Sequence, residues 1–153
     1  MNKTATPFAP AIVLRRTYKA SRQRVFDAWV NPEIAATFLG PGEVRAEIVE
    51  MNARPGGSYR IVMHMPDGTT MPVFGTYREV RAPERLSMTW SWEEDDPADQ
   101  YESLVTLQFN EITPGETELV LTHEQLKTVE SRDNHEGGWA KIVDELGTVL
   151  QQG

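Results

Sequence analysis

The sequence of 153 residues contains no cysteine. Disulfides, thiolate nucleophiles and cysteine metal sites are therefore excluded, together with the redox chemistry that depends on them. Histidine is also scarce, and the three present are His64, His123 and His135. Because they share no helical or hairpin spacing with another ligand, we expect no metal site and no cofactor.

Long apolar runs are absent too. None approaches the roughly 20 residues of a membrane-spanning helix, and residues 1–10 are too polar and too short for a signal peptide. We therefore expect a cytoplasmic protein without membrane insertion, in which residues 1–10 form a flexible tail. Basic residues are fewer than acidic ones. The sequence has 15 lysines and arginines and 23 aspartates and glutamates, which gives a net charge of -8. Such a surface repels nucleic acid, which is not expected as a partner.

The usual signatures of catalysis are missing as well. The sequence contains no Gly-x-Ser-x-Gly elbow, no phosphate loop and no dinucleotide-binding fingerprint. The densest charge run, residues 93–99, lacks the glycine and the distal glutamate of a calcium loop. We interpret this run as a solvated loop between two strands.

The last twenty residues carry the only long helical pattern in the chain. Apolar residues recur at intervals of three and four, which is typical of a helix that packs one face on a large apolar partner. They are Trp139, Ile142, Val143, Leu146, Val149 and Leu150. Asp133 or Asn134 is expected to cap the start of this helix.

Two adjacent glycines, Gly137 and Gly138, lie just inside that expected start. Each costs about 1 kcal/mol against alanine in a helix. Either the regular helix begins after them, or they leave room for something. Because Trp139 follows them directly, we favour room for a ligand at this end of the helix; a plain helix-entry turn is the alternative.

The remaining elements are shorter. Residues 11–19 read as a strand with one wet face, in which Arg16 interrupts the apolar set and needs a partner. Ser21 is expected to cap a helix that ends at Asn31, and Pro32 begins a second short helix through Phe38. Six further strands are predicted at residues 44–51, 58–65, 70–80, 86–93, 101–110 and 117–124.

This order predicts one α+β domain over residues 11–153. Strands in sequence separated by tight turns form an antiparallel meander, and about seven of them curl around the long C-terminal helix. Alternating apolar residues mark the strand faces that look at this helix. They are Tyr59, Ile61, Met63 and Met65; Leu86, Met88, Trp90 and Trp92; Ser103, Val105, Leu107 and Phe109; and Leu119, Leu121 and His123.

Short motifs along most of the chain resemble a known family. They are Leu14–Ser21, Val25–Trp29, Asn52–Gly57, Pro66–Gly68, Gly75–Val80, Pro83–Leu86 and Gly138–Trp139. With the order of elements, they resemble the SRPBCC superfamily, also called START-like or birch-pollen-allergen-like. The most similar branch is the bacterial proteins related to the C-terminal domain of the activator of heat-shock protein 90 ATPase. The resemblance implies a helix-grip fold with a cavity between the sheet and the last helix.

We expect this cavity to bind a small hydrophobic or amphipathic molecule without catalysis. The residues expected to form the site are Phe38, Met63, Met88, Trp90, His135, Gly138 and Trp139. His135 would be the polar anchor, since it lies four residues before Trp139 on the same helix face; hydrogen bonding at the helix entry is the alternative. His123 is expected to be a satisfied core histidine.

Two other functions stay open. One is a module that contacts a chaperone through its surface and takes part in the stress response, and an exposed apolar patch would favour it. The other is an enzyme of the cyclase or hydrolase kind, in which Arg16 or a histidine polarises a substrate. A buried charged pair with a perturbed pKa would favour the enzyme. The sequence is compatible with a monomer and with a homodimer.

Overall fold

The computed structural model describes residues 11–151, so the predicted tail at residues 1–10 lies outside the described part. The strands are β1 (Ile12–Tyr18), β2 (Arg45–Met51), β3 (Ser58–His64), β4 (Thr70–Arg81), β5 (Arg85–Trp92), β6 (Ser103–Thr113) and β7 (Glu116–Glu124). The helices are α1 (Arg22–Val30), α2 (Pro32–Phe38) and α3 (Val129–Gln151), with a short 3-10 helix η1 (Pro97–Asp99) inside the acidic loop. None of the helices described is long and apolar enough to cross a membrane.

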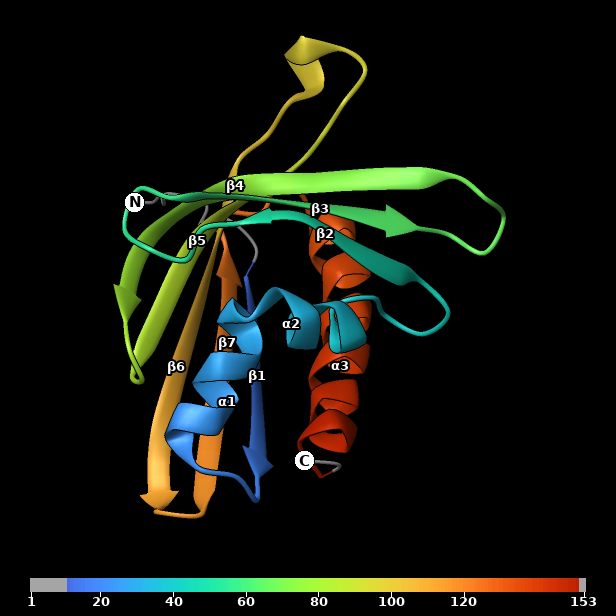
Figure 1. Cartoon of the computed structure of the whole chain (residues 1–153). Coiled ribbons are helices and arrows are strands. Elements are labelled where there is room, and N and C mark those ends of the chain that lie inside the picture. Colours follow the sequence, from blue (N-terminus) through green and yellow to red (C-terminus); the bar gives the residue numbers. More distant parts are fainter. Residues whose placement is uncertain (1–10, 152–153) are drawn as a thin grey trace.

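All seven strands form one antiparallel sheet in the order β1-β7-β6-β5-β4-β3-β2. Strands β2 to β7 follow one another as a meander, and β1 closes the series by pairing with β7. Because β1 and β2 lie at opposite edges, the segment that joins them crosses the concave face of the sheet and carries α1 and α2 (Figure 1). The prediction of a curved antiparallel sheet with two short helices after the first strand is confirmed.

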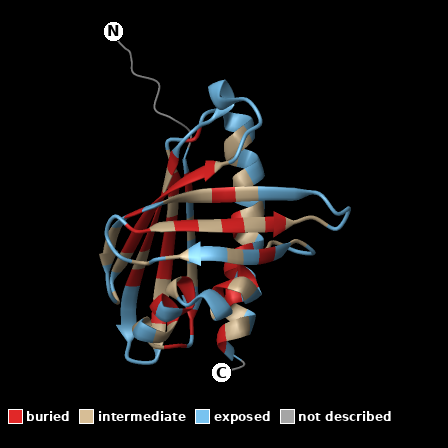
Figure 2. Ribbon diagram, turned by 45° about the horizontal axis from the view of Figure 1, so that its top comes forward, coloured by how far each residue is buried: buried red, intermediate tan, exposed pale blue. Residues whose placement is uncertain are grey.

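Helix α3 packs on the sheet with the predicted apolar stripe (Figure 2). Leu146 is fully buried, and of the six stripe residues only Val149 is half-exposed. Two polar contacts join the helix to β1. The hydroxyl of Tyr18 donates to the carbonyl oxygen of Val143 over 2.7 Å, and Nε of Arg16 lies 2.8 Å from a carboxylate oxygen of Asp144. Arg16 thus has the partner that the strand pattern required.

The start of α3 differs from the prediction. The helix begins at Val129, so Asp133 and Asn134 lie inside it and do not cap it. The side chain of Thr128 accepts a hydrogen bond from the backbone N–H of Ser131 over 3.0 Å, and threonine in this position is a favourable cap. The expectation was wrong because the first two turns of α3 have no apolar stripe. Periodicity alone therefore places the start of the helix too far along the chain.

The turns after β1 follow the sequence signals. The Ser21 side chain accepts from the backbone N–H of Arg24, and α1 begins at the next residue. Asn31 ends α1 and caps α2, where its side-chain oxygen accepts from the backbone N–H groups of Glu33 and Ile34. These predicted caps are confirmed.

Candidate functional site

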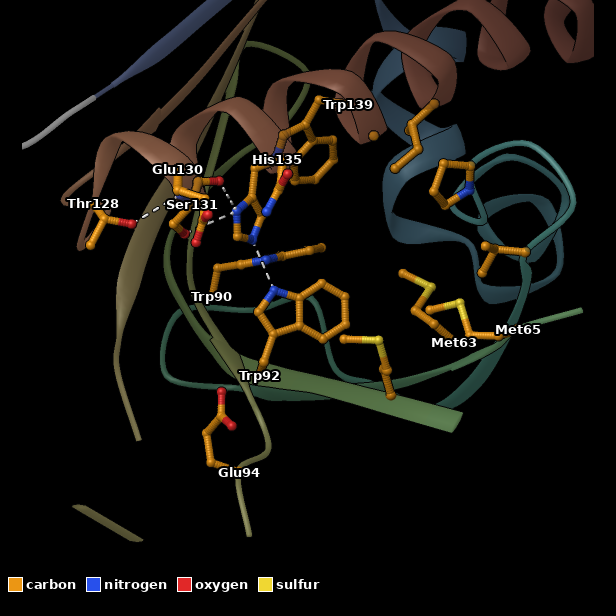
Figure 3. Close-up of a pocket in the computed structure, with 16 residues that line it drawn as sticks. Met63, Met65, Trp90, Trp92, Glu94, Thr128, Glu130, Ser131, His135 and Trp139 are labelled. Carbon is orange, nitrogen blue, oxygen red and sulfur yellow. Dashed lines mark hydrogen bonds between the residues drawn. The ribbon is translucent and has the colours of Figure 1, made fainter. Parts of the chain in front are cut away.

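A cavity of about 440 Å³ lies between the first half of α3, strands β3 to β5 and the loop after α2 (Figure 3). The residues that line it are Pro41, Val44, Met63, Met65, Met71, Trp90, Trp92, Glu94, Thr128, Glu130, Ser131, Asn134, His135, Gly138, Trp139 and Ile142. Three methionines and three tryptophans therefore form much of its wall. It occupies the position that the helix-grip resemblance implied, beneath the last helix.

Five of the seven residues expected to form the site line this cavity. They are Met63, Trp90, His135, Gly138 and Trp139. They come from three separate elements, β3, β5 and α3. The structure brings them together because alternate residues of a strand share one face, and residues three or four apart share one face of a helix.

Phe38 is not part of the wall, which corrects the prediction. It is fully buried, and its ring packs edge-on against Trp29 with the ring centroids 5.0 Å apart. Trp29 in turn lies 6.3 Å from the ring of Trp139. Phe38 is the last residue of α2 and lies in the core. It contacts the cavity wall only indirectly, through Trp29 and Trp139.

Met88 is the second correction. It lies on the same strand face as Trp90 but two residues earlier, which is roughly 6.8 Å along the strand. Its neighbours in the sheet are Tyr77 and Val105, and it is almost fully buried. The strand alternation correctly predicted the face of Met88, but the cavity does not extend that far along the strand.

The two glycines lie inside α3, not at its entry, so the plain helix-entry turn is wrong. A Cβ atom added at Gly137 would meet nothing within 4 Å. A Cβ atom at Gly138 would meet only the ring of Pro41, at an ordinary contact distance of 3.9 Å. Gly138 therefore leaves space on the cavity side of the helix, between Pro41 and the helix backbone.

Trp90 is the centre of an aromatic cluster at the inner end of the cavity. Its ring centroid lies 4.8 Å from that of Trp139, 5.8 Å from Trp92 and 6.0 Å from His123. The contact with Trp92 is edge-to-face, the arrangement that aromatic quadrupoles favour. The cluster joins the sheet to α3 with rigid, bulky side chains.

His123 is buried in this cluster and is fully hydrogen-bonded. The indole Nε1 of Trp139 donates to Nδ1 of His123 over 2.9 Å. Because an indole can only donate, Nδ1 is the acceptor and the proton of the neutral ring is on Nε2. Nε2 then donates over 2.7 Å to the hydroxyl of Ser103, which donates to the carbonyl oxygen of Trp90 over 2.9 Å. The expectation of a satisfied core histidine is confirmed.

His135 makes the same kind of contact with the opposite nitrogen. The indole Nε1 of Trp92 donates to Nε2 of His135 over 2.8 Å, as the dashed line in Figure 3 marks. Nδ1 therefore carries the proton and donates over 2.7 Å to the backbone oxygen of Ser131, one turn earlier in α3. His135 is thus hydrogen-bonded within the helix, as the alternative interpretation held, and it lines the cavity as well.

Both histidines are held in the neutral form. Burial lowers the pKa of His123 from 6.5 to about 3, and the neighbouring His135 acts in the same direction. Burial also lowers the pKa of His135, although its hydrogen bond to Ser131 opposes the shift. The two rings stand edge-to-face with centroids 4.9 Å apart. A protonated ring would turn an N–H toward an indole N–H, so the contacts agree with neutral rings.

The hydroxyl of Ser103 and the side chains of His123 and Arg16 are engaged in other contacts. The hydroxyl of Ser103 is close to His123, but Nε2 already carries the proton and cannot accept one from the serine. Arg16 does not line the cavity, since it is paired with Asp144 on the outer side of α3. Within residues 11–151, no group of three or more His, Asp and Glu side chains is arranged to hold a metal ion.

Sequence reasoning missed part of the wall. Met65 and Trp92 belong to the alternating strand faces already recognised, so that signal was available. The pairing of Trp92 with His135 could not be found, because 43 residues separate them. Glu94 was assigned to a solvated loop and Glu130 lay before the predicted helix, yet both line the cavity.

A curved antiparallel sheet around a long C-terminal helix, with a cavity beneath that helix, defines the helix-grip class of START-like proteins. The family model described as Activator of Hsp90 ATPase homolog 1-like protein matches residues 19–151. The chain belongs to this family, and the resemblance drawn from its motifs is confirmed.

Solved structures show the same fold. A protein from Chromobacterium violaceum is 24% identical, with a TM-score of 0.84 over 92% of this chain and 96% of that chain. The AHSA1 protein from Silicibacter pomeroyi is 24% identical, with a TM-score of 0.82 over 94% and 99%. A protein from Arthrobacter aurescens is 18% identical, with a TM-score of 0.84 over 95% and 88%. No curated protein matches the sequence significantly.

Proposed function

We propose that the protein binds a small, largely apolar molecule in the cavity under α3 and does not transform it. The observation that carries this proposal is a cavity of about 440 Å³ with a wall of methionine and tryptophan. This volume lies within the roughly 300 to 1,000 Å³ of small-molecule sites. Methionine side chains are flexible and polarizable, so this wall adapts to ligands of different shape.

An unpaired donor in the wall supports a ligand with one hydrogen-bond acceptor. The indole Nε1 of Trp90 is buried and has no hydrogen-bond partner among the described residues, unlike those of Trp92 and Trp139. Buried polar groups are nearly always paired, so a missing partner calls for an explanation. A carbonyl or ether oxygen on the ligand would supply the partner.

Two neutral ligands of nearly equal shape test both parts of the proposal. We expect 2-acetylnaphthalene and 2-ethylnaphthalene to quench tryptophan fluorescence with saturable binding, because three tryptophans line the cavity. The ketone should bind several-fold more tightly, since a hydrogen bond contributes about 0.5–1.5 kcal/mol. Failure of both compounds to bind saturably would count against the cavity as a ligand site.

Matched variants assign the preference to one indole. Trp90→Phe should remove the preference for the ketone while the hydrocarbon still binds. Trp29→Phe is the control, because the indole Nε1 of Trp29 is also unpaired but Trp29 does not line the cavity. Native mass spectrometry of protein purified from its own host would then search for a retained molecule.

A second candidate function follows from the family. The family description names an activator of Hsp90 ATPase, which favours contact with a chaperone. The exposed large apolar side chains lie on five different elements and one loop. Because β1 and β2 are the opposite edges of the sheet, these side chains do not all belong to one patch. They are Val13, Val49, Met71, Tyr101, Ile112 and Val129. The ATPase rate of purified Hsp90 with and without the protein tests this candidate, and an unchanged rate would count against it.

A further inference from the structure

The charged side chains of the cavity wall are of one sign. Glu94, in the loop after β5, and Glu130, in the first turn of α3, are the charged residues of its wall. No lysine or arginine of residues 11–151 contributes to this wall. In the view of Figure 3, Glu130 lies beside His135 and Glu94 lies below Trp92, and both are away from Met63 and Met65.

Neither glutamate is paired with a basic side chain within residues 11–151. Both are exposed. Lys127 is nearby in sequence, but its ammonium group lies over the ring of Tyr101, 5.9 Å from the centroid. The start of α3 adds about half a positive charge, which is less than the two carboxylates carry. The part of the wall that holds Glu94 and Glu130 therefore keeps a net negative charge.

We propose that the ligand of this cavity is a cationic amphiphile, with an apolar body among the methionines and tryptophans and an amine or quaternary ammonium group beside Glu94 and Glu130. This inference rests on the proposed function and adds the charge of the ligand to it. The carboxylates attract the cation directly, and the faces of indole rings attract cations as well. The net charge of -8 draws cations toward the protein from a distance. Fatty-acid carboxylates are disfavoured by the same charges.

Three ligands with the same chain separate this inference from the proposed function. Decyltrimethylammonium and decanoate are titrated below their micelle concentrations, and decanol below its solubility limit, against the neutral fluorescent probe N-phenyl-1-naphthylamine. Displacement should be tightest for the ammonium compound, on the order of fivefold tighter than for decanol, and weakest for decanoate. The difference should shrink as salt is added, because exposed charges are screened.

Two double variants complete the test. Glu94→Gln with Glu130→Gln should bring the three affinities within about twofold of one another. Glu111→Gln with Glu145→Gln removes the same charge from exposed positions outside the cavity wall and should leave the preference unchanged. Equal binding of all three compounds, or a preference for decanoate, would overturn the cationic ligand and leave the cavity as a binding site. Absence of displacement by every compound would overturn both proposals.

Discussion

Trp139 on α3 donates its indole N–H to Nδ1 of His123 on β7 over 2.9 Å, inside the aromatic cluster at the wall of the cavity. Both residues are buried, so this hydrogen bond links the last helix to the sheet away from water. It also fixes His123 in one neutral tautomer. Stability and site geometry therefore depend on the same contact.

Replacing Trp139 should cost more stability than replacing Trp90. Trp139→Phe leaves Nδ1 of His123 as a buried acceptor without a donor, which costs about 1–3 kcal/mol beyond the lost ring area. Trp90→Phe removes an N–H that has no partner among the described residues, so this penalty does not apply. Urea unfolding of the two variants gives the comparison, and equal losses would contradict the assigned hydrogen bond.

Stability should fall as the pH drops below about 6.5. The folded-state pKa values of His123 and His135 are lowered, so the unfolded chain binds protons that the folded protein does not. Their contribution is therefore fully present above pH 6.5 and decreases below it, by at most about 1.4 kcal/mol per pH unit for each histidine.

Urea unfolding between about pH 7 and pH 5 measures this slope before most carboxylates titrate. The double variant with His123→Gln and His135→Gln should have a shallower slope than the wild type. His64→Gln, which changes a histidine outside the cavity wall, is the matched control. A slope unaltered by the double variant would show that other groups cause the pH dependence.

Larger side chains at the two glycines should separate stability from binding. Gly137→Leu and Gly138→Leu both remove a glycine from the interior of α3, which favours the helix by up to about 1 kcal/mol each. Only Gly138 lines the cavity, so only Gly138→Leu should weaken binding of N-phenyl-1-naphthylamine, by about tenfold or more. Equal affinity in the two variants would show that the space at Gly138 is not used by the ligand.

Truncation of Leu146, on the buried face of α3, should lower stability strongly. Leu146 is fully buried, and truncation of such a leucine to alanine costs about 2–5 kcal/mol. Thr148→Ala changes an exposed residue two positions later and should stay within about 0.5 kcal/mol of the wild type. Chemical denaturation of Leu146→Ala and Thr148→Ala tests whether this helix is anchored in the core. Equal stabilities of the two variants would contradict it.

The ion pair of Arg16 with Asp144 should contribute little. The Asp144 side chain is 66% exposed, and exposed pairs contribute about 0.2–1 kcal/mol. Arg16→Met should lower the free energy of unfolding by that amount and leave binding of the fluorescent probe unchanged. A large loss of probe binding in Arg16→Met would indicate that Arg16 acts at the site, and it would favour the enzyme alternative.

Local patterns were sufficient for most elements of this fold, although not for the start of α3. The alternation around Trp90, the stripe around Leu146 and the caps at Ser21 and Asn31 all depend on residues within one or two turns, so the sequence alone reveals them. The short motifs then indicated the family. The sequence also favoured room for a ligand at Gly137 and Gly138, because two adjacent glycines in a helix require a reason.

Only the tertiary structure decided which of these residues meet. Trp92 and His135 are 43 residues apart, and their hydrogen bond depends on where the helix crosses the sheet. The extent of the cavity excludes Met88, although it shares a strand face with Trp90. Glu94 lines the cavity because of the tertiary fold, and no local pattern in the sequence indicates this position. Periodicity tells which face of an element is buried, but the distance between two faces depends on packing, and packing involves the whole chain.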